Sequence, residues 1–230
     1  MEAPLTGWHA PGALGPARLV GRFVRVEPLV PAHAEALFAA FAGHDALWNY
    51  MGGGPFDRAA WDDWVTWAAA QRDPLFHTIL TPDAGPVGVA AWLRITPAHG
   101  VAEVGHLVFA PVLQRTPAAT EAMSLMARHA FDAGYRRYEW KCNAANLASR
   151  RAATRLGFSF EGVFRQHMVV KGRNRDTAWF AMTDGDWPGI AAAHDRWLAP
   201  DNFDAAGRQN HSLADLTAPL LRQPDPGAAG

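Results

Sequence analysis

The segment from residue 101 to residue 143 constrains the fold more than any other part of the sequence. It begins with the apolar, strand-like run "VAEVGHLVFA", and the polar turn "QRTPAAT" follows at residues 114–120. A helical pattern starts within that turn and ends near Gly134, and the strand-like run "YRRYEWKCN" comes next. A helix that links two strands of one sheet normally makes them parallel. The segment therefore predicts a parallel strand pair inside a sheet.

The remaining patterns predict the other strands and helices. Residues 19–29 alternate apolar and polar side chains like one half-buried strand, and residues 74–111 contain three strand patterns separated by turn signals. Residues 158–183 predict a hairpin whose turn is "KGRN". Helical patterns lie at residues 31–48, 58–73, 147–157 and 184–199. This order predicts an α/β (α+β) fold with a mixed sheet of six or seven strands and flanking helices.

Composition and charge narrow the function classes. The 230 residues are 49% hydrophobic and 19% charged, which is typical of a globular protein with a sizeable core. Because the formal net charge is -1, we expect neither nucleic acid nor an anionic membrane as a partner. The sequence has no long apolar run, no signal-peptide pattern and only one cysteine, so we expect a cytoplasmic protein. No HExxH or CxxC spacing occurs, and no metal is expected.

The helix start near residue 117 has the properties of a phosphate-binding site. The first turn of a helix presents unpaired N–H groups and a partial positive charge. Gln114 and Arg115 add side-chain donors, Thr116 can cap the helix or contact a phosphate, and the small Ala118 and Ala119 leave the backbone accessible. Taken alone, the same pattern also fits an ordinary helix start.

A second motif, "NLASRRAATRLGFSFEGVFRQ" at residues 146–166, completes a more specific pattern. Together with "VAEVGHLVFAPVLQRTPAATEA", it resembles the GNAT superfamily of acetyl-coenzyme A-dependent N-acetyltransferases, and within it the Rim-type (RimJ/RimL-like) ribosomal-protein N-terminal alanine acetyltransferases. The resemblance implies a mostly antiparallel sheet in which the central strand pair splays apart near Val108 and Trp140. It covers residues 18–184, between an irregular segment at residues 1–17 and a C-terminal helix with an extended tail at residues 185–230. We interpret that tail as loosely attached, or as an arm that packs against a partner.

The resemblance also assigns residues to acetyl-coenzyme A. The pyrophosphate loop of the family corresponds to residues 114–119, where Pro117 and Ala119 replace two glycines. Proline removes one backbone donor. The N–H groups that stay available for phosphate belong to Arg115, Thr116, Ala118, Ala119 and Thr120.

Further cosubstrate contacts follow from the second motif. Asn146 would bond the pantetheine arm or the neighbouring backbone, and the backbone N–H near Val108 would polarise the thioester oxygen. Ser149 would protonate the leaving thiolate. Arg150 and Arg151 would either reach the nucleotide phosphates or form a solvated helix face.

The acceptor amine must lose a proton, and two residues are candidate bases. Glu103 matches a glutamate that serves as base in some branches of the family, and burial in an apolar strand would raise its pKa toward a useful range. An outward-facing surface glutamate is the alternative interpretation. His106 is the second candidate, because histidine titrates near neutrality. Cys142 would be an acyl carrier in a ping-pong enzyme, but a buried apolar role fits it better.

The acceptor pocket is expected around the glycine loop "NYMGGGPF". Asn49, Tyr50 and Trp92 are its candidate lining residues. Most of the nearby tryptophans (Trp48, Trp61, Trp64 and Trp67) are interpreted as core anchors. An aromatic, weakly charged pocket favours a small amine or a peptide N-terminus over a polycation. The aspartates Asp45, Asp62 and Asp63 would either recognise an ammonium group or lie on solvated surface.

Three functions are therefore open at this stage. The favoured one is acetyl transfer from acetyl-coenzyme A to a primary amine by direct attack in a ternary complex. The alternatives are a non-catalytic coenzyme A-binding module on the same fold and an interaction protein without a ligand. A homodimer is compatible with all three.

Overall fold

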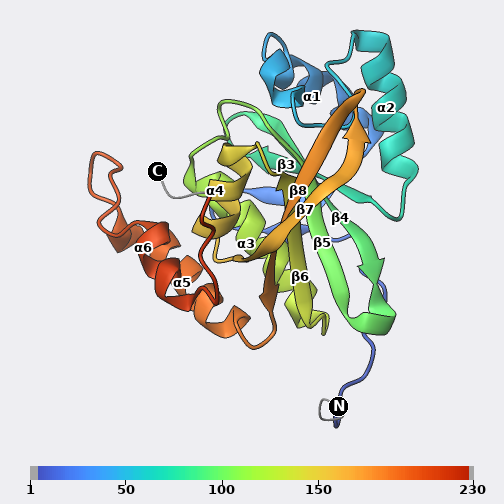
Figure 1. Ribbon diagram of the computed structural model, residues 1–230. Helices are drawn as coiled ribbons and strands as arrows, with labels where there is room; N and C mark the ends of the chain where they lie inside the picture. The colour runs from blue at the N-terminus through green and yellow to red at the C-terminus, as the bar shows by residue number, and fades with distance from the viewer. Residues whose placement is uncertain (1–4, 228–230) are drawn as a thin grey trace.

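Eight strands form one sheet in the computed structural model, which describes residues 5–227 (Figure 1). In order across the sheet, the strands are β1 (Leu19–Val20), β2 (Arg25–Pro28), β3 (Leu75–Thr81), β4 (Gly85–Thr96), β5 (Val101–Phe109), β6 (Arg137–Asn143), β8 (Arg173–Thr183) and β7 (Ser159–Val170). Only β5 and β6 pair in parallel, and all other neighbours are antiparallel. The predicted mixed, mostly antiparallel α/β sheet is confirmed, with eight strands instead of six or seven.

The additional strand arises because a tight turn divides residues 19–28. Gly21 N–H donates to Val24 O at 2.8 Å, and the Glu121 carboxylate accepts from the N–H groups of Arg22 and Phe23 at 2.9 and 2.7 Å. Glu121 is buried on the helix that follows β5, so this contact ties the turn to that helix. A side chain at position 21 would collide with the carboxylate, which explains the glycine.

The described residues form six α-helices: α1 (Ala34–Phe41), α2 (Arg58–Ala70), α3 (Pro117–Asp132), α4 (Leu147–Arg155), α5 (Trp187–Leu198) and α6 (Leu213–Thr217). Helix α5 packs on α3, and α6 packs on α4 and α5. Helix α3 links β5 to β6 and ends at Asp132, shortly before Gly134, whose φ of 90° lies in the region that favours glycine. Helices α2 and α3 lie on opposite faces of the sheet. The consecutive β3 residues Phe76 and His77 make this visible, since Phe76 contacts Trp64 of α2 while His77 contacts Trp92 under α3.

The predicted aromatic anchors form a core cluster between α1, α2 and the sheet. Trp48 and Trp61 are 6% and 1% exposed, and their rings lie 6.0 Å apart. Trp61 also donates from Nε1 to Ala34 O at 2.8 Å. Trp67 is half exposed, so it contributes to the surface as well as to the cluster. None of the described helices is both long and apolar enough to cross a membrane.

The C-terminal segment is packed, which differs from the expected loose tail. Leu213 is fully buried, and the backbone N–H of Phe160 donates to Gln223 O at 3.0 Å. The Arg150 guanidinium bonds both carboxylate oxygens of Asp225, at 2.8 and 2.5 Å, with the Asp225 side chain fully buried. These anchors are far apart in the sequence, so they produce no periodic pattern that sequence inspection would detect.

Replacement of Asp225 by alanine tests how strongly this segment is held. Burial raises the pKa of Asp225, but the Arg150 hydrogen bonds and the Gly227 N–H outweigh it and lower the pKa overall. Because removing one partner of a buried ion pair leaves an uncompensated charge, Asp225→Ala should lower the free energy of unfolding by about 3 kcal/mol. The measurement is urea unfolding at neutral pH.

Urea unfolding repeated over a range of pH gives a second test. Because the folded-state pKa of Asp225 is lowered, its contribution to the free energy of unfolding is present above the unfolded-state pKa and is lost as the pH falls through the folded-state pKa. Arg208→Gln, which removes an exposed surface pair with Asp204, should leave the unfolding midpoint unchanged. Equal effects of the two substitutions would contradict this role for Asp225.

Candidate active site

The parallel strand pair opens into a splay that positions the candidate site. β5 and β6 pair only from Val101 opposite Arg137 to Val104 opposite Trp140. An extra residue in β5 bulges the strand, because Ala91 lies opposite Gly105 while Val89 lies opposite Val108. Among residues 5–227, the edge of β5 that faces β6 therefore has no strand partner beyond Val104. The predicted splay near Val108 and Trp140 is present.

The first turn of α3 supplies free backbone donors. Thr116 caps the helix: its hydroxyl accepts from Ala119 N–H at 3.2 Å and donates to Leu113 O at 2.6 Å. Thr120 N–H is also used, by Thr116 O. Among residues 5–227, the N–H groups of Arg115, Thr116 and Ala118 have no hydrogen-bond partner. Three of the five predicted donors are thus free, and those of Ala119 and Thr120 are occupied.

Some side chains around this turn form hydrogen bonds within the protein. Gln114 Nε2 donates to Phe109 O at 2.8 Å, so this side chain braces the turn instead of projecting freely. Arg115 is exposed and has a φ of 61°. Thr120 Oγ1 accepts from Arg155 at 3.0 Å. The accessible part of the helix start is therefore mainly backbone.

Helix α4 places Ser149 beside the splay. Asn146 caps this helix by accepting from Ser149 N–H at 3.1 Å. Trp140 Nε1 donates to Ser149 Oγ at 3.0 Å, so the hydroxyl proton of Ser149 goes to a different acceptor, either the Cys142 thiol or a ligand. Burial raises the pKa of the neighbouring Cys142, whereas a hydrogen bond from Ser149 lowers it. A buried cysteine with a raised pKa stays a thiol, which disfavours the acyl-carrier hypothesis.

Arg150 does not have the geometry predicted for a phosphate ligand. Its guanidinium is bound to Asp225 and to Ala144 O, so it holds the C-terminal segment against α4. Neither alternative from the sequence, a phosphate ligand or a solvated helix face, included this ion pair, because the partner lies 75 residues away. Arg151, the next residue on α4, is exposed.

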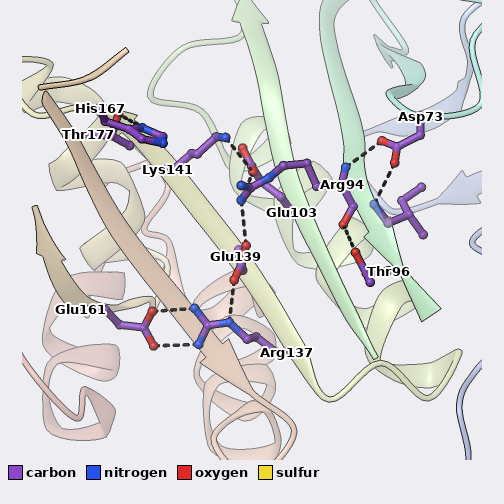
Figure 2. Close-up of polar contacts among 11 residues, drawn as sticks. Asp73, Arg94, Thr96, Glu103, Arg137, Glu139, Lys141, Glu161, His167 and Thr177 are labelled. Carbon is purple, nitrogen blue, oxygen red and sulfur yellow. Dashed lines mark hydrogen bonds and ion pairs between the residues drawn. The ribbon is translucent and has the colours of Figure 1, made fainter. Parts of the chain in front are cut away.

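Glu103 is buried on the sheet face opposite α3 (Figure 2). Its Oε2 lies 2.5 Å from Arg94 Nη2 and 3.6 Å from Lys141 Nζ. Burial raises the pKa of Glu103, and the positive charges of Lys141 and Arg94 limit the rise. The interpretation as an outward-facing surface glutamate is wrong. A buried carboxylate with a raised pKa suits a general base, but it also suits a structural ion pair.

His106 lies on the same side of the sheet as Glu103. It is the residue of the β5 bulge with a φ of 50°, and its ring lies 5.0 Å from that of Phe76. Burial, and then the charge of Lys141, lowers the pKa of His106. The imidazole is therefore neutral near pH 7 and able to accept a proton.

Two of the three predicted acceptor residues lie on an open groove. Asn49 and Tyr50 border it, together with residues of β6 and of the β7–β8 hairpin. Trp92 does not, because its side chain is 0% exposed and its ring packs 4.7 Å from His77 and 5.1 Å from His129. Trp92 is a core residue of the α3 face.

The aspartates near the glycine loop have separate positions. Asp62 pairs with Arg58 one helical turn away, as the surface interpretation predicts. Asp63 is exposed on the same helix. Asp45 lies at the rim of a small aromatic pocket of about 170 Å³ between Phe38, Trp48 and neighbouring rings. None of the three lines the open groove bordered by Asn49 and Tyr50.

Sequence inspection missed the cations around the site. Arg94 lies 4.7 Å from the Trp179 ring, and Lys141 Nζ lies 5.3 Å from it, so both cover the same indole. Lys141 was detectable, since it is two residues from Glu139 on β6 and shares its face. Arg94 was not, because its φ of 48° breaks the strand alternation. The described residues contain no cluster of three or more potential metal ligands from His, Cys, Asp and Glu.

Comparisons with known proteins agree with this architecture. The family model described as "Acetyltransferase (GNAT) domain" matches residues 24–159. No curated protein matches the chain.

Solved structures give closer matches. A GCN5-related N-acetyltransferase from Brucella melitensis is 44% identical, with a TM-score of 0.90 over 93% of this chain and 100% of the other. A probable acetyltransferase of the GNAT family from Chromobacterium violaceum ATCC 12472 is 42% identical, with a TM-score of 0.77 over 82% and 96% of the two chains. RimL, a ribosomal alpha-N-protein acetyltransferase, is 20% identical with a TM-score of 0.64 over 75% of this chain and 99% of the other, which reflects the fold alone.

Proposed function

The chain belongs to the GNAT acetyltransferase family, and we propose that it transfers an acetyl group from acetyl-coenzyme A to a primary amine by direct attack in a ternary complex. The observation that carries the proposal is the opened β5–β6 pair, with the free N–H groups of α3 beyond one strand and the Ser149 hydroxyl beside the other. The family uses acetyl-coenzyme A, which supplies the activated acetyl group when bound.

The residues present fit this cosubstrate. The unpaired edge of β5, including Val108, offers backbone groups along which an amide-containing chain can lie. The N–H groups of Arg115, Thr116 and Ala118 suit a pyrophosphate, although Pro117 contributes none. Arg151, which is exposed on α4, is a candidate for contact with the nucleotide phosphates. Asn146 acts here by fixing the start of α4 and with it Ser149.

Proton transfer is assigned to groups on the two sides of the splay. Ser149 Oγ–H is the donor for the leaving sulfur, because Trp140 already supplies the bond that the oxygen accepts. Glu103 accepts the proton of the amine through water, since its carboxylate is almost fully buried. His106, neutral and on the same face, is the alternative base.

Both acceptor classes expected from the sequence fit the proposal. A small amine or a protein N-terminus would enter from the face that carries Asn49 and Tyr50. The narrower assignment to the Rim-type branch, and with it a ribosomal-protein acceptor, is supported by the second motif at residues 146–166 and by the shared fold of RimL.

Ser149→Ala tests the proposed proton donor. Loss of a general acid should lower kcat by ~100-fold or more, because the thiolate would leave unprotonated. The dissociation constant for coenzyme A should change little, since the phosphate-binding N–H groups lie on α3. Turnover is measured from thiol release and binding by calorimetry. Equal losses of binding and turnover would show that Ser149 acts only in binding.

Glu103→Gln tests the proposed base through the pH profile. A base must be ionised, so kcat/KM of the native enzyme should rise with pH through the raised pKa of Glu103 and then level off. The variant should lose ~100-fold above that pKa and much less below it, which flattens the profile.

Two further variants make this test specific. The pKa of Glu103 is raised and that of His106 is lowered, so each inflection moves toward the other, and variants of both residues are needed to assign the base. If His106→Gln flattens the profile and Glu103→Gln does not, the base is His106. Glu139→Gln is the matched control in the same ion-pair cluster: it should keep the rise with pH and the plateau, with the inflection moved to lower pH because the Glu139 charge raises the pKa of Glu103.

A further inference from the structure

The groove beside the splay, called here the hairpin groove, is lined by a distinctive set of side chains. It has a volume of about 380 Å³, within the range of small-molecule sites. Its lining residues are Asn49, Tyr50, Asn143, Val170, Lys171, Arg173, Asn174 and Arg175. Three of these are cations and none is a carboxylate. This differs from the weakly charged, aromatic pocket expected from the sequence.

The cations of the groove are not neutralised by the protein. Within residues 5–227, no ion pair involves Lys171, Arg173 or Arg175. The nearest acidic residue in sequence, Asp176, has one carboxylate oxygen held by Gln166 N–H at 2.7 Å and by Asn174 Nδ2 at 3.0 Å. Like charges gathered without a counter-ion repel one another, so their clustering favours an anion between them.

Arg175 carries the strongest indication of a missing partner. Its Nε is buried and makes no hydrogen bond to the described part of the chain. A buried donor without an acceptor is costly, and native proteins rarely keep one without a reason. A guanidinium with free N–H groups is suited to bidentate binding of a carboxylate or a phosphate.

The hairpin groove is fixed in position next to the proposed site. Lys171 Nζ donates to Trp48 O at 3.1 Å and to Gly54 O at 2.8 Å, which ties the hairpin tip to the glycine loop. Figure 1 shows this tip beside α1 and α2. Tyr50 OH donates to Ala145 O at 3.2 Å, directly before the Asn146 cap of α4. One wall of the groove therefore adjoins the residues that position Ser149.

We propose that the hairpin groove binds an anionic group of the acceptor, a carboxylate or a phosphate, through Arg173 and Arg175. The acceptor is then a small primary amine that also carries an acid group. This inference rests on the proposed acetyltransferase function and narrows its substrate class. Lys171 adds positive charge, while its hydrogen bonds keep the groove open between the hairpin and the glycine loop.

Calorimetric titration with matched amines tests the groove without requiring turnover. The probes are ethanolamine, its O-phosphate and β-alanine, each titrated with and without saturating free coenzyme A. The phosphate or the carboxylate probe should bind, and Arg173→Gln or Arg175→Gln should weaken that binding by roughly tenfold or more, as for loss of a charged hydrogen bond. Arg165→Gln is the matched control, since Arg165 lies on β7 outside the groove lining.

The outcomes separate the two anion types and the two proposals. Binding of only the phosphate probe, or only β-alanine, identifies which anion the groove accepts. If neither binds at millimolar concentration, or if Arg173→Gln, Arg175→Gln and Arg165→Gln behave alike, the groove is not an anion site.

Turnover then addresses the proposed function separately. Equal kcat/KM for ethanolamine, its O-phosphate and β-alanine would overturn the groove proposal and leave acetyl transfer intact. Anion binding that depends on Arg173 and Arg175, without acetylation of any amine, would contradict the proposed function and leave the groove intact.

Discussion

The site depends on one break in backbone hydrogen bonding, the end of β5–β6 pairing after Val104 and Trp140. Beyond it, each strand stays with its other neighbour: Val108 and Phe109 pair with β4, and Cys142 and Asn143 pair with β8. The two halves of the sheet diverge because the β5 bulge adds twist at His106 while β6 continues straight along β8. Unpaired backbone groups at such an opening need partners, and a bound chain with amide groups can provide them.

The opening also separates two electrostatic environments. On one side, the start of α3 presents N–H groups and the positive end of the helix dipole, which suit phosphate. On the face opposite α3, Glu103 lies among Arg94, Lys141 and the Trp179 ring, which suits proton exchange with an amine. Ser149 lies on α4, where Trp140 orients it. Two ligands can therefore approach from different sides, as direct attack requires.

Features of the fold that depend on residues close together in the sequence were predictable. The helix between β5 and β6 implied their parallel pairing, and "KGRN" located the β7–β8 turn, because these signals act over a few residues. Contacts between distant residues were not predictable. From the sequence, Arg150 was interpreted as a phosphate ligand or a surface residue and the segment with Asp225 as a loose tail, whereas the two residues form an ion pair. The Glu121 contact that divides the first strand likewise joins residues about 100 positions apart. The sequence analysis wrongly placed Trp92 in the acceptor pocket, because packing against α3 determines the sheet face on which this side chain lies.

The central claim is that the opened strands and the start of α3 bind acetyl-coenzyme A. The most direct test is calorimetric titration of the protein with coenzyme A, compared with Ala119→Trp at the start of α3 and with Val112→Trp on the exposed part of the same turn. The account predicts saturable binding to the native protein and to Val112→Trp, and loss of binding in Ala119→Trp with its circular dichroism spectrum unchanged. Absence of saturable binding to the native protein at millimolar coenzyme A would contradict it.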